Sequence, residues 1–353
     1  MKDNYALIMA GGVGSRFWPM STSQRPKQFI DILGLGKSLL QMTVERISSL
    51  VPITNIYILT NSDYFELVKE QIEGIPSENI VCEPQRKNTA PCLAFASAKI
   101  HQKNPNARLV VLPSDHLILN KEGFLENIKI GLRIVEDREI VTIGIHPTRP
   151  ETGYGYIEFD NKEIFEDDRA YRLKQFREKP SLELAKEFID SGNFYWNAGI
   201  FMWSSKTIHD SFQHNSPALY ELFMRDLNPY NTEKEEEFAR YAFDQCEDIS
   251  VDYAILEKAK NVVVIAAQFD WSDLGTWNSL SQHLEKDKHS NFLKSKNTHV
   301  FDTTGTIVFT DQNKQVIIDG LNDYLVVDEK DKLMILKLEN DQKLKEYLKK
   351  SDF

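Results

Sequence analysis

The sequence has 353 residues, of which 41% are hydrophobic and 27% are charged, and its formal net charge is −11. This length suits one large α/β domain and a smaller one, and the acidic balance excludes a nucleic acid as a general partner. No apolar run reaches the ~20 residues of a membrane span, so we expect no membrane partner. The three cysteines lack metal-ligand spacing, which favours reduced thiols and a cytoplasmic protein without a signal peptide.

A short apolar run at residues 5–9 opens the chain and predicts a buried parallel strand. The turn that follows is rich in glycine, which lets a ligand approach the backbone and lets N–H groups point at phosphate oxygens. Arg16 and Lys27 add fixed positive charge. An ordinary tight turn with solvated basic residues is the alternative. We predict a phosphate site made by Ala10, Gly11, Gly12, Gly14, Ser15, Arg16 and Lys27.

The type of phosphate site is narrowed by elimination. A dinucleotide-binding fingerprint would need a glycine at position 17, which is Phe17, and a P-loop ending at Ser38 would need one at Asp31. The motif resembles the G-G-x-G-[ST]-R-x-x-P…P-K signature of the sugar-phosphate nucleotidyltransferases. Trp18-Pro19 and the run at 26–29 resemble the mannose-1-phosphate guanylyltransferase branch of that family in particular.

The next elements alternate between helix and strand. Residues 39–50 and 64–72 have helical spacing of apolar residues, and residues 55–60 and 80–82 read as strands, which predicts a parallel, doubly wound sheet. The loop at 83–91 can cap a helix through Asn88 or Thr89. It also resembles the E-P-x-x-R-N-T-A-P loop of the guanylyltransferases, which implies that Glu83, Asn88 and Ala90 bind the nucleotide. Arg86 and Lys87 depart from that pattern.

An acidic residue follows the apolar strand expected at 108–112. In open α/β sheets ligands collect at the carboxyl ends of strands, where Asp115 is a natural ligand for Mg²⁺. The alternative is that Asp115 only caps a helix or a turn. We expect His116 to have a structural role, because the attacking sugar phosphate is already anionic and needs no base.

Three further motifs resemble the sugar-binding part of the family. They are T-G-Y-G-Y-I at 152–157 after a strand at 140–145, F-x-E-K-P at 176–180, and W-N-[AS]-G at 196–199. The resemblance implies that the sugar phosphate is bound by Gly155, Glu178, Lys179 and Asn197. Glu178 would accept from sugar hydroxyls and Lys179 would hold the phosphate. The alternative is a hairpin with packed aromatic residues and an exposed ion pair.

We expect residues 215–246 to form a solvated helical layer. Residues 250–258 resemble the family's S-[IV]-D-Y-A motif, where Ser250 or Asp252 can cap a helix. A strand at 262–265 then leads to residues 271–277, which resemble W-x-D-[VIL]-G-[ST]-W. This resemblance implies that Asp273 completes the metal site with Asp115, and Asp270 is the second choice.

The C-terminal region has a different pattern. Apolar runs at 299–301, 306–309, 316–318 and 324–327 predict short strands, and residues 341–350 predict a final helix. We therefore expect an α/β fold with a Rossmann-like, doubly wound mixed sheet over residues 1–289. A small β-rich domain, similar to the family's short β-helix, would cover 290–353.

The resemblance implies a nucleotidyltransferase that converts GTP and mannose 1-phosphate into GDP-mannose and pyrophosphate with Mg²⁺. Bifunctional relatives carry a further isomerase domain, and the expectation here covers the transferase alone. Two alternatives remain open: an enzyme for another base or hexose 1-phosphate, and a catalytically silent sensor of nucleotide sugars. A homodimer is also left open by the sequence.

Overall fold

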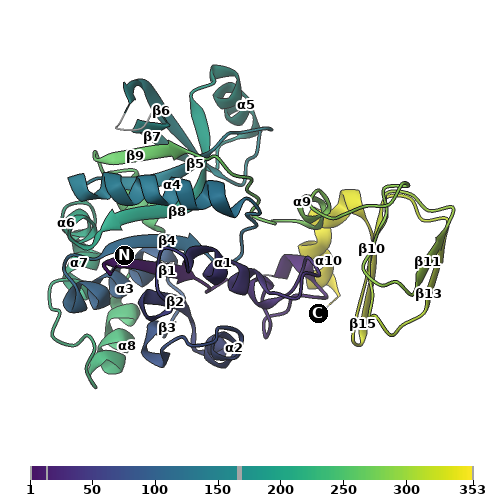
Figure 1. Cartoon of the computed structure of the whole chain (residues 1–353), viewed down its shortest axis with the longest axis horizontal. Coiled ribbons are helices and arrows are strands. Elements are labelled where there is room, and N and C mark those ends of the chain that lie inside the picture. Colours follow the sequence, from purple (N-terminus) through teal and green to yellow (C-terminus); the bar gives the residue numbers. More distant parts are fainter. Residues whose placement is uncertain (1, 13–14, 165–168, 352–353) are drawn as a thin grey trace. The chain divides into compact units, whose positions relative to one another are not determined.

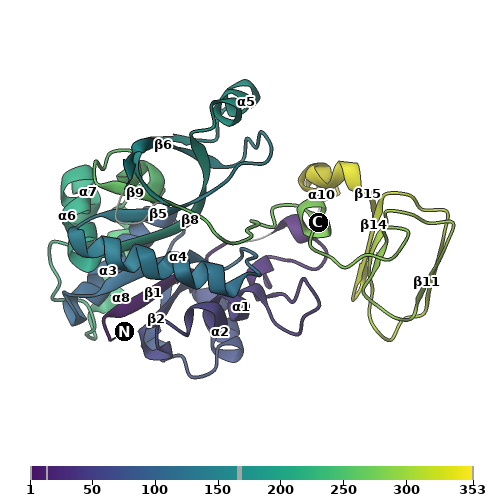
Figure 2. The same ribbon diagram turned by 45° about the horizontal axis from the view of Figure 1, so that its top comes forward.

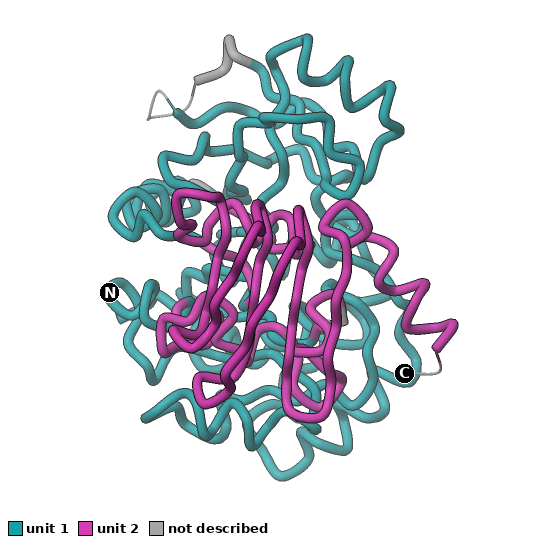
Figure 3. The backbone as a smooth tube through the Cα atoms, turned by 90° about the vertical axis from the view of Figure 1, so that its right-hand side faces the viewer, with its two compact units in different colours: residues 1–11, 43–114, 118–271 teal, residues 12–42, 115–117, 272–353 magenta. Residues whose placement is uncertain are grey.

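The computed structural model describes residues 2–12, 15–164 and 169–351. These divide into two compact units, coloured separately in Figure 3: unit 1 contains 1–11, 43–114 and 118–271, and unit 2 contains 12–42, 115–117 and 272–353. Unit 2 therefore includes residues 12–42, 115–117 and 272–289 from before residue 290 as well as the C-terminal region. The division into domains at residue 290 stays a prediction.

Unit 1 is built on a mixed sheet (Figure 1). Its described strands are ordered β3-β2-β1-β4-β8-β5-β9-β7-β6. Parallel pairing joins β1 to β2 and β4, β2 to β3, and β5 to β9, whereas β8 runs antiparallel to β4 and β5. The strands are β1 Asn4–Met9, β2 Ile56–Asn61, β3 Ile80–Glu83, β4 Arg108–Pro113, β5 Ile140–Ile145, β6 Gly155–Ile164, β7 Ala170–Glu178, β8 Phe194–Ser204 and β9 Val262–Ala266. The expected mixed α/β fold is confirmed.

Helices cover both faces of this sheet (Figure 2). Met202 of β8 and Val141 of β5 face α4, where Gly131 leaves room for them. Their neighbours Phe201 and Ile140 face the core shared with α3, α6, α7 and α8. Because successive strand residues point to opposite faces, α4 and this helical layer lie on opposite sides. The helices named here are α3 Thr89–Lys103, α4 Lys121–Ile134, α6 Ser205–Asn215, α7 Pro217–Phe223 and α8 Glu235–Gln245.

The helices expected within 215–246 are confirmed by α7 and α8, but the expectation that this layer is solvated is wrong. Phe223, Tyr230 and Phe243 are fully or almost fully buried in the largest apolar core of unit 1, around Phe95 of α3. The charged residues that dominate the composition of this segment occupy the outer faces of amphipathic helices. The other described helices of the chain are α1 Leu39–Ile47, α2 Phe65–Gln71, α5 Leu182–Ser191, α9 Trp277–Ser281 and α10 Leu344–Lys350.

Unit 2 has short strands and its own apolar core. Parallel pairs join β10 to β12, β12 to β14, and β11 to β13, and β15 closes one sheet in an antiparallel pair. In this core the ring of Trp277 packs against those of Phe17 and Phe309. The final helix begins at Leu344, after a 3₁₀ segment at 338–343. The strands are β10 Phe292–Leu293, β11 Thr298–Phe301, β12 Ile307–Phe309, β13 Val316–Asp319, β14 Tyr324–Glu329 and β15 Lys332–Lys337. Across the described part of the chain, no helix combines the length and apolar character that a membrane crossing requires.

Candidate functional site

Four of the residues predicted for phosphate and metal binding meet within unit 2: Arg16, Lys27, Asp115 and Asp273, here called the Lys27 cluster. A two-residue antiparallel bridge explains the meeting. Leu117 and Ser272 exchange backbone hydrogen bonds of 2.8 and 3.0 Å, so the segments that carry the two aspartates run side by side. Lys27 then contacts both segments, at the carboxylate of Asp115 and at the backbone oxygen of Asp273.

Lys27 joins the two segments through its ammonium group. Its Nζ lies 2.8 Å from Oδ2 of Asp115 and donates to the backbone oxygens of Asp273 at 2.7 Å and Leu274 at 3.3 Å. An ammonium has three N–H groups, and these three oxygens account for all of them. Lys27 is only 6% exposed, and its ammonium also lies over the Phe17 ring, 5.9 Å from the ring centroid. The lysine therefore organises the metal-binding candidates as well as supplying charge.

Asp115 is held in its ionised form. Burial by itself would raise the pKa of this carboxyl, but the charges of Lys27 and His116 outweigh burial and hold the pKa below its ordinary value. His116 Nε2 lies 3.8 Å from Oδ1 of Asp115. A structural role for His116 stays a prediction.

The turn at Asp273 has a constrained backbone. Leu274 has φ of +45°, a conformation that bulky side chains rarely adopt. The next N–H, that of Gly275, donates to Oδ1 of Asp273 at 3.0 Å. A Cβ on Gly275 would lie 2.7 Å from Oδ2 of Asp273 and 3.2 Å from Nη1 of Arg16, so only glycine leaves the carboxylate and guanidinium in place.

The donor set of the Lys27 cluster is suited to a hard cation. Asp115 and Asp273 offer carboxylate oxygens, and Mg²⁺ typically takes one or two protein carboxylates and fills its other positions with phosphates and water. No group of three or more His, Cys, Asp or Glu residues in the described part of the chain could hold a metal. Asp270, the second choice, has a structural role: its carboxylate accepts the N–H groups of Leu119 at 2.9 Å and Asn120 at 2.7 Å.

The glycine-rich turn divides between the two units. In unit 1, a Cβ on Gly11 would lie 3.6 Å from Oε1 of Glu83, and the N–H of Ala10 donates to Leu59 at 2.7 Å. In unit 2, Gly12 has open space at its Cβ position, and its carbonyl accepts from Gln28 at 2.9 Å. Ser15 begins a 3₁₀ turn, and Gly14 lies outside the described residues.

The loop after β3 ends in the expected helix cap. Asn88 has φ of +65°, and its side chain accepts the N–H of Thr89 at 2.9 Å at the start of α3. The N–H of Ala90 donates to the carbonyl of Ile249 at 3.1 Å. This N–H is therefore used within the protein, and Ala90 would contribute to ligand binding through the space that its small side chain leaves. Lys87, which departs from the family pattern, donates to the carbonyl of Cys246 at 3.2 Å.

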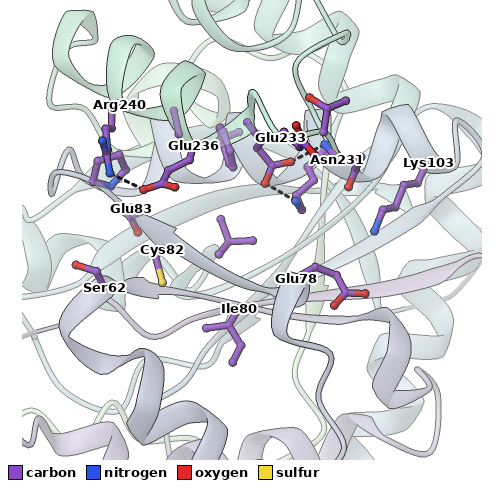
Figure 4. Close-up of a pocket in the computed structure, with 17 residues that line it drawn as sticks. Ser62, Glu78, Ile80, Cys82, Glu83, Lys103, Asn231, Glu233, Glu236 and Arg240 are labelled. Carbon is purple, nitrogen blue, oxygen red and sulfur yellow. Dashed lines mark hydrogen bonds and ion pairs between the residues drawn. The ribbon is translucent and has the colours of Figure 1, made fainter.

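Glu83 is the titratable group of this loop. Burial raises its pKa to about 7, and a hydrogen bond from the Cys92 thiol and the charge of Arg86 reduce that effect only in part. Glu83 also lies at a cavity of about 930 Å³ in unit 1, lined by the strand β3, by α3 and by residues 231–240. Figure 4 shows Glu83 and Cys82 along one side of this cavity, and Glu236 and Arg240 across from them. None of the other described residues predicted for the site lines it.

The residues predicted for sugar binding meet in unit 1, together with Asp252, and are here called the Asn197 cluster: Gly155, Glu178, Lys179, Asn197 and Asp252. Lys179 Nζ lies 3.2 Å from Oε1 of Glu178, and the side chain of Lys179 is 64% exposed. A Cβ on Gly155 would lie 2.6 Å from Oε2 of Glu178, so a side chain at position 155 would displace the carboxylate.

Aromatic side chains fix the backbone beside Lys179. Tyr154 packs edge-on against Trp196 and Trp271, with ring centroids 5.2 and 5.3 Å apart. The carbonyl of Tyr154 accepts the N–H of Lys179 at 3.2 Å, and Lys179 has φ of +45°. The exposed ammonium thus stands on a backbone that is itself well fixed.

The sequence did not predict that Asp252 would contact Asn197. Asn197 Nδ2 donates to Oδ1 of Asp252 at 2.9 Å, whereas its Oδ1 accepts the N–H of Gly199 at 3.1 Å and the hydroxyl of Thr142 at 3.2 Å. Burial and the nearby charge of Glu178 raise the pKa of Asp252 to about 6. The only signal in the sequence was the motif at 250–258, which does not identify the residue that Asp252 touches.

Comparison with known proteins gives consistent similarities. Residues 5–290 match the model of the nucleotidyl transferase family. Mannose-1-phosphate guanylyltransferases from Klebsiella pneumoniae and Escherichia coli are each 34% identical over 353 residues, covering 98% of this chain and 74% of the relative. A solved structure from Thermus thermophilus, named a mannose-1-phosphate geranyltransferase, has 31% identity and a TM-score of 0.87. It aligns over 99% of this chain and 100% of its own.

Proposed function

The chain belongs to the nucleotidyl transferase family and, within it, to the mannose-1-phosphate guanylyltransferases, and we propose that it makes GDP-mannose and pyrophosphate from GTP and mannose 1-phosphate. A phosphate oxygen of mannose 1-phosphate forms a bond to the α-phosphorus of GTP. The bond from that phosphorus to the oxygen bridging it to the β-phosphate breaks, and pyrophosphate leaves. The observation that carries the proposal is the convergence of Asp115 and the Asp273 turn on Lys27.

The Lys27 cluster is assigned to the triphosphate. Arg16 supplies a guanidinium fork that suits phosphate oxygens. Lys27 contributes charge from a fixed position, and a direct phosphate contact would exchange one of its three protein partners. Asp115 and Asp273 would hold Mg²⁺, whose charge offsets that of the phosphates. The aspartates, the lysine and the arginine position the reacting groups, which is the main source of catalysis in this class of reaction.

Four residues of the Asn197 cluster are assigned to binding mannose 1-phosphate: Gly155, Glu178, Lys179 and Asn197. Lys179 is the exposed cation that holds the sugar phosphate, and Glu178 accepts hydrogen bonds from sugar hydroxyls. Gly155 keeps the space that the Glu178 carboxylate needs, and Asn197 donates from its amide. No general base is required, because the entering phosphate oxygen is already anionic.

Glu83 is assigned to the base. Guanine presents the N1–H and the 2-amino group as neighbouring donors, and a carboxylate can accept from both. Uracil and thymine lack that pair of donors, which is the physical basis for a preference for GTP. The further nucleotide contacts that we propose are made by Ala10, Gly11, Gly12, Gly14, Ser15, Asn88 and Ala90.

Three further features complete the proposal: the β-helix, the cellular compartment and the assembly. We infer that the parallel strands of unit 2 are turns of a short β-helix, since β10, β12 and β14 pair in parallel, as do β11 and β13. Cys82, Cys92 and Cys246 are free thiols, which fits a reducing cytoplasm. A homodimer is the assembly that we propose to test first.

Pyrophosphate release is the decisive measurement. Purified protein with Mg²⁺ is given GTP, UTP or dTTP in turn, each with mannose 1-phosphate or glucose 1-phosphate. We expect the highest kcat/KM for GTP with mannose 1-phosphate. A different best pair would assign the chain to a sister activity, and binding of GDP-mannose without pyrophosphate release from any pair would identify a sensor.

A further inference from the structure

Asp252 contacts the amide of Asn197 directly, and its geometry defines a specific task. Two independent partners fix which end of the amide is oxygen. The N–H of Gly199 can only donate, so the atom 3.1 Å from it is Oδ1, and an ionised Asp252 can only accept, so the atom 2.9 Å from it is Nδ2. One N–H of the amide is thereby used, and the second is the group that Asn197 can offer a ligand.

Asp252 is itself held in place from two sides. It begins a π-helical turn at 252–256, and such turns occur frequently at functional sites. Just before it, the N–H of Val251 donates to the hydroxyl of Thr89 at 2.9 Å, and the carbonyl of Ile249 accepts from Ala90 at 3.1 Å. The segment that carries Asp252 is thus anchored on the first turn of α3.

At this location the ionisation of a carboxylate costs free energy. Asp252 is largely buried and faces Glu178, whose negative charge opposes its ionisation. A purely structural cap of the turn at 252–256 would not need this position, because Ser250 Oγ already accepts the N–H of Tyr253 at 3.4 Å. The carboxylate also accepts hydrogen bonds from its own N–H and from the Ser250 side chain, and its contact with Asn197 is the one that reaches outside this turn.

We infer that Asp252 is a positioning residue for sugar-phosphate binding, which holds the Asn197 amide in the orientation that presents its second N–H to the sugar. The inference rests on the proposed function of Asn197 and assigns a task to a residue outside the proposed binding set. Asp252 acts through Asn197 and need not touch the substrate.

A double-mutant cycle tests this role at pH 8, where Asp252 is ionised. For Asp252→Ala we expect the KM for mannose 1-phosphate to rise about tenfold, the effect of losing one good hydrogen bond, with the KM for GTP unchanged. Asp252→Asn keeps an acceptor and should restore most of the affinity. In an Asn197→Ala background, Asp252→Ala should have no further effect, because the residue that it positions is gone.

Three results would overturn the inference: wild-type kinetics for Asp252→Ala, an Asp252→Asn defect as large as that of Asp252→Ala, or additive effects in the double variant. Additivity would mean that Asp252 contacts the sugar directly. Glu257→Gln is the matched control, because Glu257 belongs to the same segment and also lies near Glu178, yet is exposed. We expect wild-type kinetics for this variant.

Failure of the proposed function is distinguishable from failure of the inference. If the wild-type protein releases no pyrophosphate, the proposed function is wrong, and crystal structures of the unliganded variants then decide. The inference expects the Asn197 amide to rotate or to adopt two conformers in Asp252→Ala and to stay in place in Asp252→Asn. An unmoved amide in Asp252→Ala would overturn it.

Discussion

The ammonium of Lys27 lies 2.8 Å from the carboxylate of Asp115, and the same ammonium donates to the backbone oxygen of Asp273 at 2.7 Å. One buried cation thus joins two aspartates that are far apart in the sequence. Removing Lys27 would take away positive charge and would also release the Asp273 turn. Removing the charge of either aspartate would leave this arrangement largely in place. Variants at the three positions therefore distinguish the effect of losing a charge from the effect of releasing the Asp273 turn.

Asp115→Asn and Asp273→Asn test the metal mechanism. Asparagine can still accept the N–H of Gly275 or the ammonium of Lys27, but it lacks the negative charge that holds Mg²⁺. We expect kcat to fall by roughly two orders of magnitude or more, the scale for loss of a main electrostatic group, with little change in melting temperature. Near-wild-type turnover of both variants, or full activity in excess EDTA, would contradict the metal site.

Lys27→Met tests the organising role. The variant keeps the length of the stem in the core but leaves Asp115 and two backbone oxygens without their donor. Hydrogen bonds to charged groups contribute about 1.5–3 kcal/mol, so we expect a melting temperature lower by several degrees together with a large loss of kcat. An unchanged melting temperature would show that the turn at Asp273 does not depend on Lys27.

Lys179→Met provides the contrast for Lys27→Met. The Lys179 side chain is 64% exposed, and an exposed ion pair such as that with Glu178 contributes little to stability, so the melting temperature should stay at the wild-type value. The KM for mannose 1-phosphate should rise, because a cation facing a dianion is lost, and GTP binding should stay nearly intact. Unchanged sugar-phosphate kinetics would mean that Lys179 is only a surface charge.

Local patterns in the sequence predicted much of the fold. Apolar runs bounded by polar or glycine-rich segments predicted β1 to β5 and β9 of unit 1, and the helical spacing of apolar residues at 39–50 and 64–72 predicted α1 and α2. These signals are local, because strand and helix periodicity depend on near neighbours. The strand β15 was missed because its short apolar run at 333–336 follows β14 closely in the sequence.

The arrangement of the candidate site could be predicted only in part. The motifs identified Asp115 and Asp273, but the bridge between Leu117 and Ser272 that brings them together depends on the tertiary fold. The contact between Asp252 and Asn197 is likewise a tertiary one. No sequence motif states which partner a buried carboxylate will meet, because burial and pairing are properties of the packed chain.

Glu83 gives a prediction that couples stability, pH and base recognition. Burial raises its pKa to about 7 from an ordinary value of 4.5, so the folded protein keeps a proton that the unfolded chain has lost. The stability that this proton contributes is fully present below pH 4.5 and is lost as the pH rises to about 7. Ionised Glu83 therefore costs on the order of 3 kcal/mol at pH 8. Glu83→Gln removes that cost, so its melting temperature should exceed that of the wild type at pH 8 by more than at pH 5.

The same substitution should weaken GTP binding, because only the ionised carboxylate accepts from both guanine donors. For the wild type, the KM for GTP should fall as the pH rises through about 7, the pKa of Glu83. For Glu83→Gln the KM should be higher at pH 8 and should not show that pH dependence. The preference for GTP over ITP, which lacks the 2-amino group, should also shrink.

Glu78→Gln is the control, since Glu78 lines the same cavity, precedes β3 and has no proposed contact with the base. Differential scanning fluorimetry at the two pH values and steady-state kinetics from pH 6 to 8.5 give both readouts. If Glu83→Gln is more stable than the wild type at pH 8 but has wild-type GTP kinetics, Glu83 is a buried carboxylate that does not bind guanine.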